Sequence, residues 1–376
     1  MQANPEHPPV RDFFGMLSAE VDSAIKVFGW PKFRGKQLLD WVYSKGVVDA
    51  SGMTNFSHHD RAVIPRLFQF ATGTITKQQI SEDGTIKLLI TWPGGSNAET
   101  VMIPDGDRRT ACVSSQVGCP VRCKFCASGM DGLKSSLGAA QIVEQIWHLN
   151  EVLAKTQSVD QAKAAQPCVP AARVTNVVFM GMGEPLSNYN QVMQAVRIMH
   201  DPQCFNLGAR RITISTVGVP PKIRQLAEEL LPLNLALSLH APNEPLRKQL
   251  IPWAEHFPLP EILDACRYYF SKTGREITLE YILLSNVNDR PEHARELARL
   301  CKTLRANVNL IRYNEVEPLP FKRPGSKNVV AFQDILRNMG VNAHVRKSRG
   351  RDIDAACGQL RRKEARESLV QLGTGG

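Results

Sequence analysis

The chain has 376 residues, of which 43% are hydrophobic and 22% are charged, as in an ordinary folded protein. No apolar run reaches the length of a membrane span, and the first residues lack the basic and apolar regions of a secretory signal. The sequence therefore predicts no membrane-spanning helix. We expect a cytoplasmic monomer that does not bind membranes, with one large domain and a smaller one.

The charge balance is basic. Lys and Arg number 46 against 36 Asp and Glu, a formal net charge of +10. Such an excess favours a nucleic-acid partner, because phosphate contacts supply affinity whatever the base sequence. A merely solvated basic surface is the alternative. The nine cysteines occur without an export signal, which favours metal binding or catalysis over structural disulfides.

Residues 1–70 are predicted to form a small helical accessory domain. Apolar residues recur at helical spacing in segments 18–28 and 33–43. Basic side chains surround the second segment: Lys32, Arg34, Lys36 and Lys45. The domain is therefore either an RNA-binding module or a solvated helical cap.

The hydrophobic pattern of residues 71–104 changes to the period of β-strands. Two strand-like segments, 74–80 and 85–92, flank an Asp-Gly pair, which is typical of a hairpin turn. Another strand begins near Glu99. We expect this region to be a β-hairpin connection between the helical domain and the rest of the chain.

Strands and helices alternate through residues 105–345. The segments typical of buried strands are 110–117, 175–180, 211–216, 235–240, 276–284 and 307–313. Helical segments are predicted at 139–152, 189–200, 221–230, 259–271 and 292–304. This alternation indicates βα units on a parallel sheet, and six units suit an α/β fold with a partial (βα)6 barrel. Residues 155–172 are predicted to be a surface insertion without a chemical role.

Three cysteines, Cys119, Cys123 and Cys126, follow the first of these strands in the pattern C-x-x-x-C-x-x-C. Thiols this close in sequence cannot all form unstrained disulfides. They can bind a [4Fe–4S] cluster, which normally takes four thiolates, so that one iron is left open to bind a small molecule. The alternatives are a structural zinc site that includes Cys112, and buried free cysteines. Burial alone explains four others: Cys168, Cys204, Cys266 and Cys301.

Polar residues follow the predicted strands, where α/β folds place their chemistry. The glycine-rich segment Gly181–Pro185 follows the second strand, and Glu184 in it offers a carboxylate for an ammonium group. Ser215, Ser238–His240 and Asn314 end the third, fourth and sixth strands. Each of these residues alone suits a structural role, but together they predict a site for a polar small molecule.

Several motifs in this order resemble the radical S-adenosylmethionine superfamily, and within it the RlmN/Cfr-type RNA methyl synthases. They are the cysteine triplet and residues 114–119, 181–185, 238–243 and 352–360. The resemblance implies a radical-SAM barrel with a [4Fe–4S] cluster on Cys119, Cys123 and Cys126, and S-adenosylmethionine on its open iron. The S-adenosylmethionine contacts that it implies are Gly183, Glu184, Ser215, Ser238, Leu239, His240 and Asn314.

The resemblance also implies a reaction, the methylation of carbon 2 of adenosine in 23S ribosomal RNA and, in several members, of the adenosine next to the anticodon in tRNA. One S-adenosylmethionine would methylate Cys357, and a second, cleaved at the reduced cluster, would supply the radical that takes a hydrogen from that methyl group. After addition to carbon 2, Glu99 would remove a proton and Cys112 would release the product by forming a transient disulfide with Cys357. A reducing electron donor such as flavodoxin is the implied partner.

Two other functions stay open. The first is methylation of carbon 8 of the same adenosine, the Cfr-type reaction, and the second is a non-catalytic iron–sulfur or zinc protein that binds RNA. By position alone, Glu99 suits a solvated strand end and Cys357 a small buried residue.

The C-terminal segment, 346–376, suits either contact with an RNA backbone or a solvated helix. Its basic residues include Arg346, Lys347, Arg349, Arg351, Arg361, Arg362 and Lys363.

Overall fold

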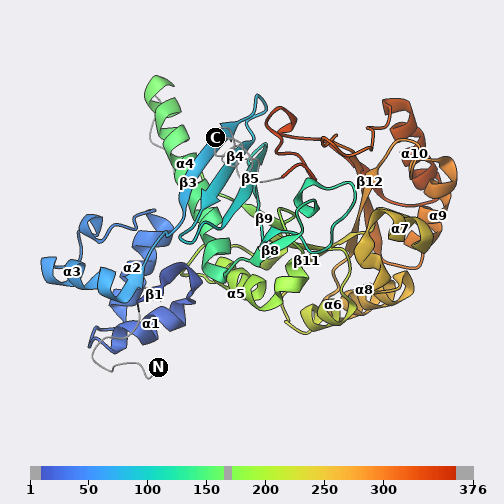
Figure 1. Cartoon of the computed structure of the whole chain (residues 1–376). Helices are drawn as coiled ribbons and strands as arrows, with labels where there is room; N and C mark the ends of the chain where they lie inside the picture. The colour runs from blue at the N-terminus through green and yellow to red at the C-terminus, as the bar shows by residue number, and fades with distance from the viewer. Residues whose placement is uncertain (1–9, 165–171, 361–376) are drawn as a thin grey trace, which may run out of the picture.

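A computed structural model describes residues 10–164 and 172–360 (Figure 1). In these residues, ten strands form one sheet in the order β14-β13-β12-β11-β10-β9-β6-β5-β4-β3. The strands are β3 (Thr74–Ile80), β4 (Ile86–Thr91), β5 (Asn97–Asp105), β6 (Arg108–Cys112), β9 (Asn176–Phe179), β10 (Ile212–Thr216), β11 (Asn234–Ser238), β12 (Ile277–Leu283), β13 (Ala306–Arg312) and β14 (Ala343–Arg346). The edge strands β3 and β14 do not pair with each other, so the barrel is open, as predicted.

The barrel part of the sheet is parallel from β6 through β9 to β14. Helices connect its strands: α4 (Ala139–Ala164), α5 (Tyr189–His200), α6 (Pro220–Ala227), α7 (Glu244–Leu250), α8 (Leu259–Thr273), α9 (Pro291–Cys301) and α10 (Ser326–Asn338). The helices bury an apolar stripe, as α10 does with Val329, Phe332 and Leu336. The described part of the chain therefore contains six βα units, and β14 adds a seventh parallel strand. The sequence prediction did not include α7, α10 or β14.

One predicted strand is wrong. Residues 110–117 do not form a single strand, because β6 ends at Cys112 and a separate strand, β7 (Gln116–Gly118), pairs with β8 (Leu133–Ser136). The chain leaves the main sheet at Ser114, whose backbone N–H donates to Gln145 Oε1 (2.8 Å) and whose hydroxyl donates to the Glu99 carbonyl oxygen (2.6 Å). These bonds pair the polar groups of Ser114, which no longer have partners in the sheet. The break turns the chain into the cysteine loop.

The N-terminal region is helical, as predicted, and lies beside α4 and α5 at one end of the molecule (Figure 1). Its helices are α1 (Ser18–Lys26), α2 (Phe33–Leu39) and α3 (His58–Leu67), and β1 (Arg11–Asp12) pairs with β2 (Phe68–Gln69). Trp147 of α4 donates its indole N–H to the Val42 carbonyl oxygen (3.2 Å) and packs against buried Phe14. This contact joins the helical region to the barrel.

The β-hairpin connection continues the barrel sheet. β5 pairs antiparallel with β6, so Val101 lies opposite Cys112. β4 pairs in turn with β5, and Leu89 lies opposite Glu99. Side chains two residues apart in a strand share a face. Glu99, Val101 and Cys112 therefore lie on one face of the sheet.

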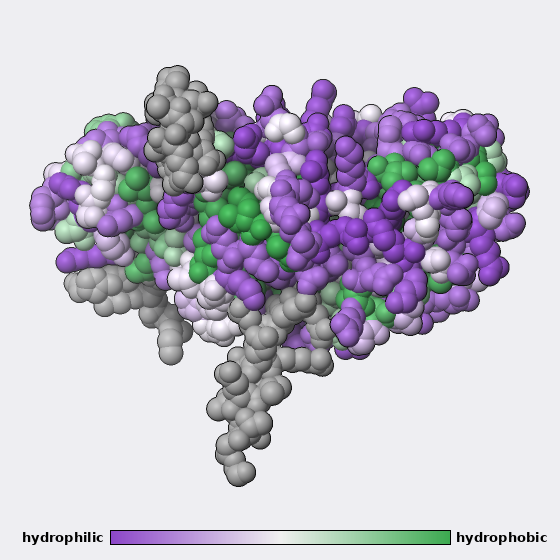
Figure 2. Space-filling model, turned by 90° about the horizontal axis from the view of Figure 1, so that it is seen from above, coloured by the Kyte–Doolittle hydropathy of each residue, from purple (hydrophilic) through white to green (hydrophobic). Residues whose placement is uncertain are grey.

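The surface seen from above is mostly hydrophilic, with smaller hydrophobic patches between polar areas (Figure 2). Within residues 10–164 and 172–360, no helix is both long and apolar enough to cross a membrane. The predicted insertion at 155–172 begins inside α4, which runs to Ala164, and residues 165–171 lie outside the described part. Cys168 and the basic residues Arg361, Arg362 and Lys363 also lie outside it.

Candidate active site

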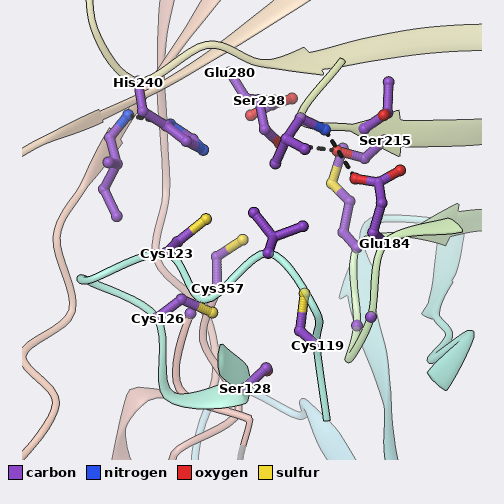
Figure 3. A pocket seen from close by; sticks show the side chains of 18 of the residues that line it. Cys119, Cys123, Cys126, Ser128, Glu184, Ser215, Ser238, His240, Glu280 and Cys357 are labelled. Atoms are coloured by element: carbon purple, nitrogen blue, oxygen red, sulfur yellow. Dashed lines mark hydrogen bonds between the residues drawn. The ribbon is translucent and has the colours of Figure 1, made fainter. Parts of the chain in front are cut away.

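The three clustered cysteines line one cavity at the carboxyl end of the barrel strands (Figure 3). Their loop is held by backbone bonds from Cys126 N to Cys123 O (3.1 Å), from Cys119 N to Gly132 O (3.2 Å) and from Lys124 N to Leu250 O (2.9 Å). Burial, followed by the neighbouring Cys126, raises the pKa of Cys119 to about 12. Without a bound cation these thiols therefore stay protonated, whereas a metal centre binds the thiolate.

Glu184, Ser215, Ser238 and His240 face the cysteines from the opposite wall of this cavity (Figure 3). The Ser215 and Ser238 hydroxyl oxygens are 3.3 Å apart. These residues come from the ends of β10 and β11 and from the loops after β9 and β11, which meet at one edge of a parallel sheet. These four predicted polar residues therefore meet at this edge.

Both carboxylate oxygens of Glu184 accept backbone hydrogen bonds. Leu186 N donates to Oε1 (3.0 Å) and Val217 N donates to Oε2 (2.9 Å). Burial raises the pKa of Glu184, and these two bonds act in the opposite direction. The preceding Gly183 has φ of 109°, and a Cβ there would lie 2.7 Å from Gln116 Cβ. Only glycine therefore allows the loop after β9 to pack closely against the strand that enters the cysteine loop.

His240 lines the same cavity as a neutral imidazole. Its Nδ1 accepts a hydrogen bond from Ile282 N (3.1 Å), which places the ring proton on Nε2. Burial, followed by the charge of Arg247, lowers the pKa of His240 to about 3. The ring meets Phe125 of the cysteine loop edge to face, with 5.0 Å between centroids. His240 is therefore a fixed N–H donor group beside the cysteines.

A second cavity lies next to the first and is lined by Cys112, Asn314 and Cys357. Cys357 lines both cavities, as do Met180 and Ile311. Cys112 and Cys357 are distant in sequence, and the predicted pair is brought to one place by the fold. Among the described residues, Cys357 is therefore the thiol that the cysteine-triplet cavity and the Cys112 cavity have in common.

Both thiols of the second cavity are protonated near neutral pH. Burial and the neighbouring Cys357 raise the pKa of Cys112 to about 12. Burial likewise raises the pKa of Cys357. The Arg346 guanidinium acts in the opposite direction on both thiols, because a nearby cation favours the thiolate.

Arg346 lines the second cavity and pairs there with a buried carboxylate. Its Nη1 lies 3.5 Å from Glu280 Oε2 and 3.6 Å from Met180 Sδ. Glu280 lines the first cavity, and its Oε1 accepts a hydrogen bond from Asn309 Nδ2 (3.0 Å). Glu280 is not among the site residues that the sequence predicts. Its position as the one carboxylate in the mostly apolar segment 277–284 could have indicated it, because an unpaired carboxylate is rarely buried.

Besides Cys112, three predicted site residues do not line the first cavity. Leu239 lies fully buried in the hydrophobic core. Asn314 lines the second cavity and donates to the Cys357 carbonyl oxygen (3.5 Å). Glu99 is buried on β5, where its Oε1 lies 3.3 Å from Lys87 Nζ. The segment that carries Cys357 also bonds to the cysteine loop through Ala127 N and Gly358 O (2.8 Å).

The cysteine set fits a cluster better than a single ion. Cys112 lies in the other cavity, so the four cysteines of the zinc alternative do not surround one point. Within the residues described, no three His, Cys, Asp or Glu side chains are arranged to hold one metal ion. A cluster instead binds each thiolate through a different iron. The predicted burial of Cys204, Cys266 and Cys301 is confirmed.

An open parallel barrel with three cysteines in the loop after its first strand defines a radical S-adenosylmethionine enzyme. The model of the Radical SAM superfamily matches residues 113–301. The model of the "Ribosomal RNA large subunit methyltransferase N-terminal domain" matches residues 12–69.

Individual relatives define the family more narrowly. The "probable dual-specificity RNA methyltransferase RlmN" of Symbiobacterium thermophilum is 44% identical over 94% of this chain and 92% of its own length. The protein of the same name from Dictyoglomus turgidum is 43% identical over 91% and 94%. The crystal structure of a radical SAM methyltransferase from Sphaerobacter thermophilus matches with a TM-score of 0.86 and 41% identity, over 93% of this chain and 99% of that one. The chain therefore belongs to the RlmN family of radical SAM RNA methyltransferases.

Proposed function

We propose that this protein methylates carbon 2 of adenosine in 23S ribosomal RNA and of the adenosine next to the anticodon in tRNA. Family membership supports an RNA methyltransferase that uses S-adenosylmethionine. The observation that carries the methyl-carrier mechanism in this proposal is the position of Cys357, which lines both the cavity of the cysteine triplet and the cavity of Cys112. A methyl carrier between a donor site and a resolving thiol needs such a position.

The cofactors would occupy the first cavity. Cys119, Cys123 and Cys126 would hold a [4Fe–4S] cluster, and the polar groups of the opposite wall would bind S-adenosylmethionine. When bound, they supply the methyl group and the radical chemistry that a non-nucleophilic ring carbon requires.

The chain's own residues would carry the group and move the proton. Cys357 loses its thiol proton and accepts the methyl group, a step that the Arg346 guanidinium favours by stabilising the thiolate. Glu99 takes the proton that leaves carbon 2 of the adenine. Cys112 loses its thiol proton and attacks the Cys357 sulfur, which forms an S–S bond and breaks the bond from sulfur to the transferred carbon. That carbon takes up a proton, which completes the methyl group, and the RNA is released. Two electrons from a thiol reductant restore both thiols by exchange, whereas a donor such as flavodoxin would reduce the cluster.

The second cavity would admit the target nucleotide. Lys347 and Arg349 line it, and Arg349 lies 3.9 Å from Asp105. Basic side chains at this opening suit phosphate contacts, which position an RNA without reading its sequence. Arg346 also lines this cavity, but its partner Glu280 is buried, whereas the Asp105 partner of Arg349 is exposed and such a pair is weak. Phosphate binding is therefore assigned to Lys347 and Arg349.

Anaerobic reconstitution tests the proposal. The protein would be incubated with iron, sulfide, a reductant, S-adenosylmethionine and either 23S ribosomal RNA or tRNA, and the digested nucleosides identified by mass spectrometry. We expect 2-methyladenosine from both RNAs. Finding 8-methyladenosine would indicate the Cfr-type reaction, and finding neither would reject a methyltransferase acting on these RNAs.

A further inference from the structure

A buried ion pair on the hairpin lies outside the cofactor cavity. Lys87 Nζ on β4 is 3.3 Å from Glu99 Oε1 on β5, and each side chain is 8% exposed. Lys87 lies opposite Val101 in the β4–β5 ladder, which makes it a diagonal neighbour of Glu99 on the same face. Because Val101 also lies opposite Cys112, the ion pair and the resolving thiol share this face of the sheet.

Lys87 also contacts the segment that carries Cys357. Its Nζ donates to the carbonyl oxygen of Asp354 (3.3 Å). Other bonds join the hairpin turn to the same segment, including Ser81 Oγ to Asp352 Oδ1 (2.6 Å) and Gly350 N to Asp83 Oδ2 (3.0 Å). The Lys87 ammonium therefore bridges the Glu99 carboxylate and the backbone three residues before Cys357.

Stability alone does not require this ion pair. Burying two charges costs several kcal/mol in desolvation, and apolar residues of similar volume are often equally stable in such positions. The neighbours on this face, Leu89 and Val101, are apolar. A purely structural contact could therefore be made without charge.

We propose that Lys87 is a positioning residue that keeps the Glu99 carboxylate ionised and fixed relative to the Cys357 segment. The inference rests on the proposed function, in which the proton from carbon 2 passes to Glu99. Lys87 itself makes and breaks no covalent bond. It acts on proton removal, so the earlier methylation of Cys357, which does not use Glu99, is independent of it.

The positioning role of Lys87 is tested by measuring methylation of Cys357 and release of the RNA adduct separately. The variants are Lys87→Met, which removes the charge, and Lys87→Arg, which restores it, with Lys302→Met as a matched control on an exposed lysine at the far end of the barrel. Methylation of Cys357 without RNA would be measured by peptide mass spectrometry, and release of the covalent RNA–protein adduct would be measured on denaturing gels in a single turnover.

We expect Lys87→Met to methylate Cys357 at the wild-type rate. Release of the adduct should be about 10- to 100-fold slower, because the variant would lose part of the rate enhancement that a general base supplies. Lys87→Arg should recover most of the loss, and Lys302→Met should match the wild type. Loss of Cys357 methylation together with release would indicate general disruption of the segment and would overturn the proposal.

Glu99→Gln separates this proposal from the function on which it rests. If Glu99→Gln blocks release while Lys87→Met releases normally, Lys87 has no positioning role but Glu99 remains the base. If Glu99→Gln itself releases normally, the assignment of Glu99 is wrong. Should Lys87→Met not fold, Lys87→Gln retains a donor for the Asp354 carbonyl without the charge, and a normal release rate in that variant would equally overturn the proposal.

Discussion

Cys357 and Cys112 line the same cavity although they lie at opposite ends of the barrel sequence. Cys112 ends β6, the first barrel strand, and Cys357 lies beyond β14, the last strand of the sheet. Cys357 also lines the cavity of the cysteine triplet. One thiol therefore borders both the cysteine triplet and Cys112 in a single arrangement of the fold.

Cys357→Ala is expected to abolish RNA methylation, because no other described thiol lines both cavities. The thermal midpoint should change by only a few degrees, since the substitution removes one sulfur atom from a partly buried position. Mass spectrometry of nucleosides from treated RNA measures the activity.

The matched control for this loss is Cys266→Ala, which removes an equally small group from the core under α8. It should retain methylation after a comparable loss of stability. A Cys357→Ala variant that still methylated RNA would remove Cys357 from the proposed reaction.

Cys112→Ala is expected to trap an RNA–protein adduct. Without this thiol, no group in the second cavity can attack the Cys357 sulfur, so the bond to the transferred carbon persists. A denaturing gel with labelled RNA would show a slower band that contains both molecules. Normal turnover by Cys112→Ala would contradict the resolving role, and absence of the band in Cys112→Ala/Cys357→Ala would show that Cys357 carries the link.

The sequence predicted the barrel well because its signals are local. Apolar strands alternating with amphipathic helices define βα units, and polar residues at strand ends such as Ser215 and Ser238 meet because parallel strands end at one edge. The cysteine spacing predicted the loop that lines the cavity. These features required no knowledge of long-range contacts.

Other features depend on contacts that no local pattern contains. The strand predicted through 110–117 breaks because Gln145, on a later helix, bonds the backbone of Ser114. Arg346 resembled a solvent-exposed RNA contact, yet it pairs with Glu280 from a different strand. The bridge from Lys87 to Glu99 and Asp354 likewise joins three distant segments.

Cys126→Ala is expected to prevent cluster assembly, because two thiolates from the loop leave the cluster short of a ligand. The loop itself should survive, since Cys126 supports it through a backbone bond to Cys123 O that alanine retains. Iron and sulfide content after anaerobic reconstitution, with the visible absorption spectrum, measures assembly. Cys204→Ala, a buried cysteine away from the cavity, is the control and should load iron normally. A full iron content in Cys126→Ala would exclude Cys126 as a ligand.

His240→Asn is expected to weaken the dependence of stability on acid pH. Burial lowers the pKa of His240 from 6.5 to about 3, so between these values the unfolded chain binds a proton that the native protein does not. Stability contributed by the neutral ring above pH 6.5 is therefore lost as the pH falls toward 3. One such proton corresponds to a slope of about 1.4 kcal/mol per pH unit in the free energy of unfolding. In the variant, the free energy of unfolding should therefore change less steeply with pH, by up to this amount.

Asparagine suits this position for two reasons. Its Oδ1 can replace Nδ1 as the acceptor for Ile282 N, and it tolerates the left-handed backbone of His240, where φ is 58°. Urea unfolding at several pH values across the window measures the slope. His256→Asn, on an exposed loop, is the matched control and should keep the wild-type slope. If His240→Asn also kept it, the imidazole would not be the buried neutral group that faces the cysteines.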